Sequence, residues 1–429
     1  MSRKYITWLV SDTANGLTVA LVAFGIPILV LMVTDEPAQA GIIGGIGVAV
    51  RAISALFGGV LADRHSRAAL MLAGAVIGLL IAGGFTAAAV TGSLGFAVLL
   101  IVEVLLALRN GIFGMAGEAA LKNVVPANAM GRAQGANQAR DAILELLGAP
   151  LGGVLLAFGA TLLGAVLLLC QVIAGLTAVL LYRLLPDHAA PSRTEQSETT
   201  STARPIKKMI TEVGEGFRWL FSRPDLRGVL AVATLINLGF STAVTTVIYA
   251  IQQAGHSPAI VGMVSAGSGA ALLIGALISS VLVVRIRTGT LVIAGLMALT
   301  GAVLLLPFVH PVPLTIAVLA VGLLPIPSVN AGLTGYFMVA VPDRLIGRAN
   351  SAIALLATGA MPLAPLFAGF GLSWFGRTPT LIFSSAICLL AALLALAGRD
   401  LRSLPAEKEW AEHAATCSPD PDPDPDLTT

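Results

Sequence analysis

Twelve long stretches of the chain contain few or no charged side chains. A helix that crosses the roughly 30 Å hydrocarbon core of a bilayer needs about 20 apolar residues, and each stretch is long enough. They cover residues 6–33, 41–62, 68–90, 94–118, 137–158, 160–182, 226–253, 258–284, 289–309, 313–340, 350–373 and 378–398. Strands of a transmembrane β-barrel would be short and alternate apolar with polar residues. Since only helices and closed barrels satisfy the backbone in lipid, we predict an all-α membrane protein with twelve transmembrane helices.

The composition agrees with a lipid environment. Charged residues make up 11% of the chain and hydrophobic residues 56%, whereas a soluble domain has about 25% charged residues. Aromatic residues are only 5%, so most of the apolar mass comes from small aliphatic side chains, which let helices approach closely. The sequence therefore predicts a tightly packed helical bundle.

The basic residues predict the orientation in the membrane. If the first helix starts in the cytoplasm, all but three of the 25 basic residues lie on the inner side. Of these three, Arg51 and Arg109 fall within helices, and Arg377 falls in an outer loop. This bias follows the positive-inside rule, so both termini are expected to be cytoplasmic. The basic residues are spread over several inner segments rather than gathered on one face, so no nucleic-acid partner is expected.

A polar segment divides the twelve stretches into six and six. Residues 183–225 are rich in Ser, Thr and Pro and end in an amphipathic part, which suits a short helix on the inner membrane surface. The predicted organisation is an N-terminal six-helix bundle over 1–182, a cytoplasmic linker over 183–225, a C-terminal six-helix bundle over 226–400, and a disordered cytoplasmic tail over 401–429.

The two halves share a short repeat. "VVPANAMGRA" at 124–133 and "AVPDRLIGRA" at 340–349 have Val, Pro, Gly, Arg and Ala at matching positions, in the inner loop between the fourth and fifth helices of each half. Repeats with the same orientation are related by an axis along the membrane normal in the major facilitator superfamily. The chain resembles that family, and the resemblance implies two bundles that move against each other.

The loop between the second and third helices carries the most specific motif. "GGVLADRHSRAAL" resembles the superfamily signature G-x-x-x-D-R-x-x-R, with Gly59, Asp63, Arg64 and Arg67 as gating residues. Gly59 would allow close helix approach, and Asp63 would lie near the positive N-terminus of the next helix. Such a contact can hold one conformation closed and break in another. The alternative is an ordinary cluster of charges that ends a membrane span. The second half has Val284 where Asp63 stands, so the gate is predicted to be one-sided.

Two further motifs bear on the direction of transport. Arg109 in "LRNGIF" resembles the buried arginine of the family's second signature. "LLGAPLGGVL" is similar to the G-P-x-x-G-G signature of exporters, with Pro150 and Gly153 as further gating residues and Ala149 in place of the usual glycine. With the opening segment, these motifs resemble the drug and siderophore exporter branch, which includes macrolide efflux proteins and the enterobactin exporter. The resemblance implies an exporter in the bacterial cytoplasmic membrane.

Charged residues inside membrane helices are costly and usually functional. The candidates for proton coupling all lie in the first half, and they are Asp12, Arg51, Glu103, Arg109 and Glu145. Counting residues from the helix ends places Arg51 and Glu103 near the membrane midplane. We predict that they pair and that Glu103 accepts a proton when the pair opens; a permanent structural ion pair is the alternative.

Asp141 lies one helical turn before Glu145, on the same side of the fifth helix. With Arg109 and Asp12 these carboxylates suit a water-filled inner cavity. Adjacent Arg140 favours an interfacial position for Asp141, and Glu118 is also predicted to be interfacial.

Candidate substrate-binding residues are the polar residues on helices that line the central cavity in this family, namely Asn15, Asn237, Tyr249, Asn330 and Tyr336. Structural hydrogen bonding is the alternative role for each of them.

The sequence shows no zinc-ligand cluster, Walker loop or nucleophile constellation, so no enzymatic activity, metal or cofactor is expected. The predicted partners are a small-molecule substrate, protons and the lipid bilayer, and the expected state is a monomer. The predicted function is proton-coupled efflux of amphipathic small molecules such as drugs, antibiotics or siderophore-like natural products. Two alternatives remain open at this point: a facilitator or importer of a small metabolite, and a membrane sensor that signals through the central loop or the tail.

Overall fold

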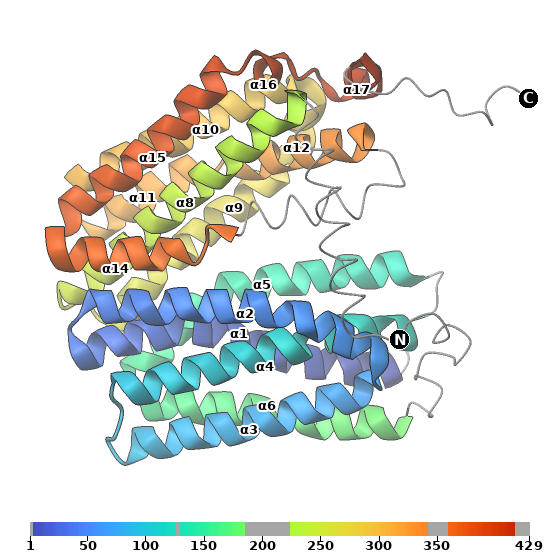
Figure 1. Ribbon diagram of the computed structural model, residues 1–429, viewed down its shortest axis with the longest axis vertical. Helices are drawn as coiled ribbons and strands as arrows, with labels where there is room; N and C mark the ends of the chain where they lie inside the picture. Colours follow the sequence, from blue (N-terminus) through green and yellow to red (C-terminus); the bar gives the residue numbers. More distant parts are fainter. Residues whose placement is uncertain (1–2, 126–128, 185–223, 342–358, 417–429) are drawn as a thin grey trace, which may run out of the picture. The chain divides into compact units, whose positions relative to one another are not determined.

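The computed structural model describes residues 3–125, 129–184, 224–341 and 359–416. All regular secondary structure in these ranges is helical, which confirms the all-α prediction. The chain divides into two compact units (Figure 1). Unit 1 comprises Met1–Glu198, Thr245–Ala266 and Pro362–Arg377, and unit 2 comprises Thr199–Val244, Gly267–Met361 and Thr378–Thr429.

Unit 1 is built on six long helices. These are α1 (Arg3–Thr34), α2 (Pro37–Arg64), α3 (Arg67–Val90), α4 (Phe96–Val124), α5 (Met130–Ala157) and α6 (Ala160–Leu184). The unit also includes the end of α8 (Pro224–Gln253), the start of α9 (Pro258–Arg285) and α14 (Leu363–Phe375). Short connections join several of the six helices, because Asp35 and Gly159 adopt positive φ angles of 55° and 113° that turn the chain sharply.

Helices of unit 1 pack closely where glycines remove side chains. α2 packs along α4, and α3 packs along α6. A methyl group on Gly58 would collide with the backbone carbonyls of Gly111 and Ile112 on α4, whereas one on Gly59 would meet no atom within 4 Å. Close helix approach was predicted at Gly59, and this contact is not seen among the described residues in this conformation. Gly58, its neighbour, faces α4 instead, since adjacent residues on a helix point about 100° apart.

Unit 2 contains the rest of α8 and α9, followed by α10 (Thr288–Leu305), the 3₁₀ turn η4 (Leu306–Phe308), α11 (Val312–Leu323), α12 (Ile326–Ala340) and α15 (Arg377–Ala397). The stretch 313–340, predicted as one helix, is interrupted between α11 and α12. Pro325 caps α12, and Pro327 lies in its first turn. Because proline lacks an N–H donor and its ring clashes with the preceding turn, it interrupts the helix at this point.

The chain after α15 is folded up to residue 416. It forms α16 (Arg399–Ser403), the 3₁₀ turn η6 (Glu407–Glu409) and α17 (Trp410–Thr416). The indole of Trp410 is 7% exposed, and its Nε1 donates to Thr288 Oγ1 at 3.0 Å and to the Pro405 carbonyl at 3.2 Å. The prediction of a disordered tail from residue 401 is therefore wrong for residues 401–416. Buried apolar side chains such as Leu404 and Trp410 hold this segment in place.

Many large apolar side chains lie on the outer surface. Leu80, Leu176 and Leu277 are 71%, 67% and 75% exposed, an arrangement that lipid favours and that water would penalise. Ten helical segments among the described residues are long and apolar enough to cross a membrane. Two predicted stretches are not among these ten. One is α5, which has several charged and amide side chains, and the other is α14, of which 13 residues are apolar helix.

Candidate functional site

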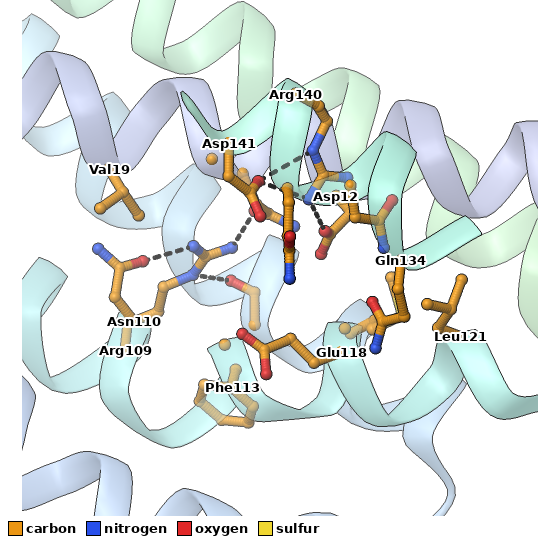
Figure 2. Close-up of a pocket in the computed structure, with 18 residues that line it drawn as sticks. Asp12, Val19, Arg109, Asn110, Phe113, Glu118, Leu121, Gln134, Arg140 and Asp141 are labelled. Atoms are coloured by element: carbon orange, nitrogen blue, oxygen red, sulfur yellow. Dashed lines mark hydrogen bonds and ion pairs between the residues drawn. The ribbon is translucent and has the colours of Figure 1, made fainter. Parts of the chain in front are cut away.

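A polar pocket of about 530 Å³ lies inside unit 1, between side chains of α1, α3, α4 and α5. This volume falls within the ~300–1,000 Å³ range of small-molecule sites. The pocket brings together charged and amide side chains that are far apart in the sequence (Figure 2). Its polar lining consists of Asp12, Asn15, Arg109, Asn110, Glu118, Gln134, Asn137, Gln138, Arg140 and Asp141. We refer to it as the polar pocket.

Arg140 of α5 forms the ion pairs of the polar pocket. Its Nη2 lies 2.7 Å from Asp12 Oδ2 and 2.7 Å from Asp141 Oδ1. The guanidinium carbon also lies 5.6 Å from the centroid of the Trp8 ring, a cation–π distance. The indole of Trp8 is fully buried and donates to the Gly117 carbonyl at 2.8 Å. Arg140 therefore links α1 to α5 through a charge-assisted hydrogen bond.

Gly117 of α4 leaves room for this pair. A methyl group on Gly117 would collide with Asp12 Oδ1. The absence of a side chain at this position lets the carboxylate of Asp12 lie against α4 while it binds Arg140.

Arg109 of α4 is held by neutral acceptors. Its Nε donates to the Gly74 carbonyl at 2.8 Å, and Nη1 donates to Asn110 Oδ1 at 2.8 Å. Its Nη2 donates to Asn15 Oδ1 at 2.6 Å and to Gln171 Oε1 at 3.0 Å. No carboxylate takes part in these four bonds. The guanidinium is 5% exposed, so its positive charge lies inside the unit without an anionic partner among these acceptors.

The acceptors of Asn137 and Glu118 in the pocket wall have no partner among the described residues. Asn137 is 7% exposed, and its Oδ1 accepts no hydrogen bond within the described part of the chain. Glu118 is exposed, and its carboxylate forms no hydrogen bond or ion pair with another described residue. In Figure 2 its side chain extends into the same space as Asp12 and Arg140. Glu118 thus offers an accessible acceptor, and Asn137 offers a buried one that no described residue satisfies.

A second, smaller cavity of about 50 Å³ contains Arg51 and Glu103. Glu103 is 7% exposed, and its Oε2 has no hydrogen-bond partner among the described residues. Arg51 and Glu103 form no ion pair within 4.0 Å in the described structure, so the predicted pair is not present in this conformation. Val19 and Asn110 line both cavities, and the small cavity therefore adjoins the polar pocket.

Glu145, the remaining predicted coupling residue, is separate from these groups. It is exposed on α5, and it is not among the residues that line either cavity. The structure therefore brings Asp12 and Arg109 together in the polar pocket, places Arg51 and Glu103 next to it, and leaves Glu145 outside.

Of the predicted gating residues, Arg67 is best defined. Its Nη1 donates to the Ala119 carbonyl of α4 at 3.0 Å. The side chains of Asp63 and Arg64 lie outside the described residues, as does most of the second copy of the repeat at 340–349. Pro150 lies within α5, and a methyl group on Gly153 would collide with the Pro258 carbonyl of the same unit. Gly153 therefore lies in close contact with the start of α9.

The predicted substrate-binding residues are divided between the two units. Asn15 lines the polar pocket, and Tyr249 is buried in unit 1, where its hydroxyl donates to the Ala40 carbonyl at 3.1 Å. In unit 2, Asn237 and Asn330 are exposed. Tyr336 is 1% exposed, and its hydroxyl oxygen lies 2.9 Å from Nδ1 of His413 in α17. These contacts indicate that Tyr336 packs against α17.

Sequence reasoning missed several residues of the polar pocket. Asp141 and Glu118 were expected at the membrane interface, and Arg140 and Asn137 were not named as site residues; nor was Gln171, which binds Arg109 from outside the pocket lining. The signal for Gln171 was its isolated position in the apolar stretch 160–182, and for Asn137 it was the run of amides that begins α5. An uncharged polar residue in such a stretch needs a partner, because lipid supplies none. Among the described residues, no group of three His, Cys, Asp or Glu side chains is arranged to hold a metal.

Comparison with known proteins identifies the family of the chain and a distant relative. Residues 10–362 match the sequence model of the Major Facilitator Superfamily. The chain is also 26% identical over 398 residues to the enterobactin exporter EntS of Citrobacter koseri. The aligned residues cover 90% of this chain and 89% of EntS.

Solved structures with a similar fold are transporters of several kinds. A bacterial homologue of the iron transporter ferroportin, in an inward-facing state, gives a TM-score of 0.69 at 14% identity and covers 94% of this chain and all of that one. A bacterial homologue of the human lysosomal transporter Spinster gives 0.68 at 14% identity, over 94% and 99% of the two chains. A POT family transporter bound to 5-aminolevulinic acid gives 0.67 at 13% identity, over 92% and 96%. These likenesses concern the fold alone.

Proposed function

Because the chain belongs to the Major Facilitator Superfamily, we propose that this multi-pass membrane transporter exports amphipathic small molecules in exchange for protons. The substrates would be drugs, antibiotics or siderophore-like natural products. The resemblance to the enterobactin exporter EntS supports export, and the exporter-like "GAPLGG" segment of α5 supports it as well.

The observation that carries proton coupling is the state of Glu103. Its carboxylate is buried in a helix long and apolar enough to cross the membrane, and one of its oxygens has no partner among the described residues. A carboxylate in such a place is costly when charged and is favoured when it has a proton or a cation beside it. Glu103 also lies in a cavity that shares Val19 and Asn110 with the polar pocket. A proton that reaches the polar pocket therefore has a short route to Glu103.

We assign the polar pocket to the route of the substrate and the proton. Asp12 and Arg109 would respond to the charge on Glu103 through the groups between them, chiefly Asn110, which accepts a hydrogen bond from Arg109. Arg51 lines the cavity of Glu103 and would pair with its carboxylate after the proton leaves. The gating residues would then close and open the inner side of the protein; they are Gly59, Asp63, Arg64, Arg67, Pro150 and Gly153. Glu145, which lies outside both cavities, would only tune the inner entrance.

We also propose a topology for the chain in the membrane. The chain would cross the bacterial cytoplasmic membrane twelve times as two six-helix halves, 1–182 and 226–400, with both termini in the cytoplasm. It would act as a monomer by alternating access. In the second half, Asn237, Tyr249, Asn330 and Tyr336 would complete the substrate route, with Tyr249 and Tyr336 contributing through packing.

The test uses proteoliposomes with the full-length protein and a panel of amphipathic dyes and antibiotics. Proteins oriented with the cytoplasmic face outward should accumulate a substrate inside the vesicles when the lumen is acidic, and a protonophore should abolish the accumulation. Glu103→Gln should lose the gradient-driven accumulation and keep substrate exchange at equal concentrations, because the neutral amide occupies the same space without binding a proton.

The matched control is Glu36→Gln, which changes an exposed carboxylate in the loop between α1 and α2. It should behave like the wild type. Transport that is indifferent to the protonophore would favour a facilitator, and accumulation in the opposite direction would favour an importer. Unchanged gradient-driven accumulation by Glu103→Gln would remove Glu103 from the coupling role.

A further inference from the structure

The charges in the wall of the polar pocket favour a cationic ligand. Among the described residues, the wall has three carboxylates, Asp12, Glu118 and Asp141, and two guanidinium groups, Arg109 and Arg140. Arg140 is shared between Asp12 and Asp141, both at 2.7 Å. Glu118 has no ion-pair partner in the described structure. The formal balance of these five described groups is therefore one negative charge, and a ligand with one positive charge would neutralise it.

Arg109 is poorly placed to attract an anion. Four N–H bonds of its guanidinium already go to Gly74, Asn110, Asn15 and Gln171. A guanidinium has only five such donors, so at most one remains for a ligand. An anionic ligand would also meet the three carboxylates of the same wall.

An independent observation points to a ligand with N–H donors. The side chain of Asn137 is more than nine-tenths buried in the pocket wall, and its Oδ1 accepts no hydrogen bond from any described residue. Buried polar atoms are nearly always paired in folded proteins. A primary ammonium group supplies three donors and no acceptor, and it would satisfy such an oxygen as well as a carboxylate. A quaternary ammonium group carries the charge without the donors.

The rest of the wall is apolar. Val19, Met71, Phe113 and Leu121 line the same space, which suits the apolar body of an amphipathic molecule. Arg140 Nη1 is also buried without a hydrogen-bond partner. It can donate to a hydroxyl or carbonyl oxygen of a ligand, whereas a ligand carboxylate there would lie beside Asp12 and Asp141.

From these contacts we propose that the polar pocket recognises small organic cations with N–H donors on an apolar body, such as primary amines. The cation pairs with Glu118 and competes with Arg140 for Asp12 and Asp141, and its N–H groups satisfy Asn137. This proposal rests on the proposed function, since it names the substrate class of the same site.

The test measures binding, independently of transport. Four fluorescent probes share a dansyl body and a five-carbon chain or its closest analogue: dansylcadaverine, its N-trimethylated form, the terminal alcohol, and the terminal carboxylate. Each is titrated into the purified full-length protein in detergent, with empty micelles as the blank. We expect the ammonium probe to bind about tenfold tighter than the alcohol, and the carboxylate to bind most weakly, because charge-assisted hydrogen bonds are the strong ones.

Variants of single wall residues locate the site. Glu118→Gln should weaken the ammonium probe by about tenfold and the alcohol by less than about twofold. Asn137→Leu should weaken the ammonium probe more than the trimethylammonium probe. Glu118 has no side-chain bond to lose in the described structure, so Glu118→Gln should fold even if Asn137→Leu does not. Glu36→Gln, outside the pocket, is the matched control and should leave all four affinities unchanged.

Equal affinities for the ammonium and alcohol probes, or an unchanged affinity of Glu118→Gln for the ammonium probe, would overturn the proposal. The proposed function fails separately. Tight ammonium binding without gradient-driven transport would refute proton-coupled export and leave the binding site standing. Gradient-driven export of uncharged compounds without selective ammonium binding would refute the cation-binding site and leave proton-coupled export standing.

Discussion

Arg140 of α5 binds Asp12 of α1 through a 2.7 Å contact between Nη2 and Oδ2, and the two residues are 128 positions apart in the sequence. The side chains are 15% and 18% exposed, so water screens the pair only in part. The same nitrogen also binds Asp141, whose side chain is 61% exposed. Since Asp141 lies on α5 itself, the pair with Asp12 is the one of the two that joins α5 to α1.

This relationship predicts a non-additive response to substitution. Arg140→Gln leaves Asp12 without its cation, and we expect unfolding to become easier by roughly 1–3 kcal/mol, below the ~3–5 kcal/mol of a fully buried pair. Asp12→Asn should cost a similar amount. The double variant Asp12→Asn with Arg140→Gln should cost clearly less than the two single costs added together. Equilibrium unfolding in denaturant measures the free energy of unfolding of the wild type, the two single variants and the double variant.

The control for this cycle pairs Arg140→Gln with Asp141→Asn, because Asp141 is largely exposed. Its coupling energy should be under about 1 kcal/mol. If the Asp12 cycle is additive within about 0.5 kcal/mol, the ion pair does not link α1 to α5 in solution.

Adjacent glycines of α2 should respond to alanine in opposite ways. Gly58→Ala places a methyl group against the backbone carbonyls of Gly111 and Ile112, which cannot rotate away. We expect α2 and α4 to separate locally, with a loss of about 1–3 kcal/mol of stability. Gly59→Ala meets no atom within 4 Å and should stabilise the helix by roughly 0.5–1 kcal/mol. Thermal unfolding in detergent gives the comparison.

The transport activity of these two variants tests the gate separately. If no conformation of the transport cycle needs close helix approach at Gly59, Gly59→Ala should transport normally. A stable but inactive Gly59→Ala would show that Gly59 is needed in another conformation, and it would restore the role that the signature motif suggested.

Gly47 of α2 controls the position of Glu103. A methyl group on Gly47 would collide with Glu103 Oε1, the end of a flexible side chain. Gly47→Ala should therefore fold normally, within about 1 kcal/mol of the wild type, while Glu103 is forced into another orientation. We expect gradient-driven transport to fall severalfold, as measured in proteoliposomes. Gly84→Ala, whose methyl group meets no atom within 4 Å, is the control.

The same variant in a Glu103→Gln background separates the two roles of Gly47. Gly47→Ala should leave unchanged the substrate exchange that Glu103→Gln retains, because the carboxylate that it displaces is already absent. A further loss in the double variant would mean that Gly47 acts on the packing of α2 rather than on Glu103.

The helices were predictable because lipid leaves the backbone few choices. A stretch of 20 apolar residues must be helical in a membrane, so the bounds of α3 (predicted 68–90, found Arg67–Val90) and α6 (predicted 160–182, found Ala160–Leu184) came out within a few residues. The break at Pro325 was missed, because the stretch around it is apolar throughout and hydropathy does not register a missing N–H donor.

The site was predicted less well, since side-chain partners come from packing and not from spacing. Asp12 and Arg109 were named as charges in helices, and the structure places both in the polar pocket. The Arg51 and Glu103 pair was inferred from equal depth in the membrane. Equal depth fixes the position of two residues along the membrane normal but not the distance between them in the membrane plane. Arg51 and Glu103 share a cavity but form no ion pair in the described structure.

The segment after α15 gives the last prediction, which concerns unit 2. Trp410 and Leu404 are buried against Tyr336 and Phe337, and the backbone N–H groups of Thr288 and Gly289 donate to the carbonyls of Pro405 and Leu404 at 3.1 Å. Truncation after residue 398 removes these contacts and exposes the aromatic residues of α12. We expect it to lower the stability of unit 2 by at least the ~3–5 kcal/mol of a buried Trp-to-Ala change.

Truncation after residue 416 is the matched control, since every contact just named is retained. It should transport and unfold like the wild type. Trp410→Phe separates packing from hydrogen bonding, because it keeps most of the ring and loses the Nε1 donor to Thr288. It should cost about 1–2 kcal/mol, less than Trp410→Ala. If truncation after 398 leaves unfolding unchanged, residues 399–416 are not part of the folded core of unit 2. If truncation after 416 abolishes transport while stability holds, a role for the last 13 residues in signalling would follow.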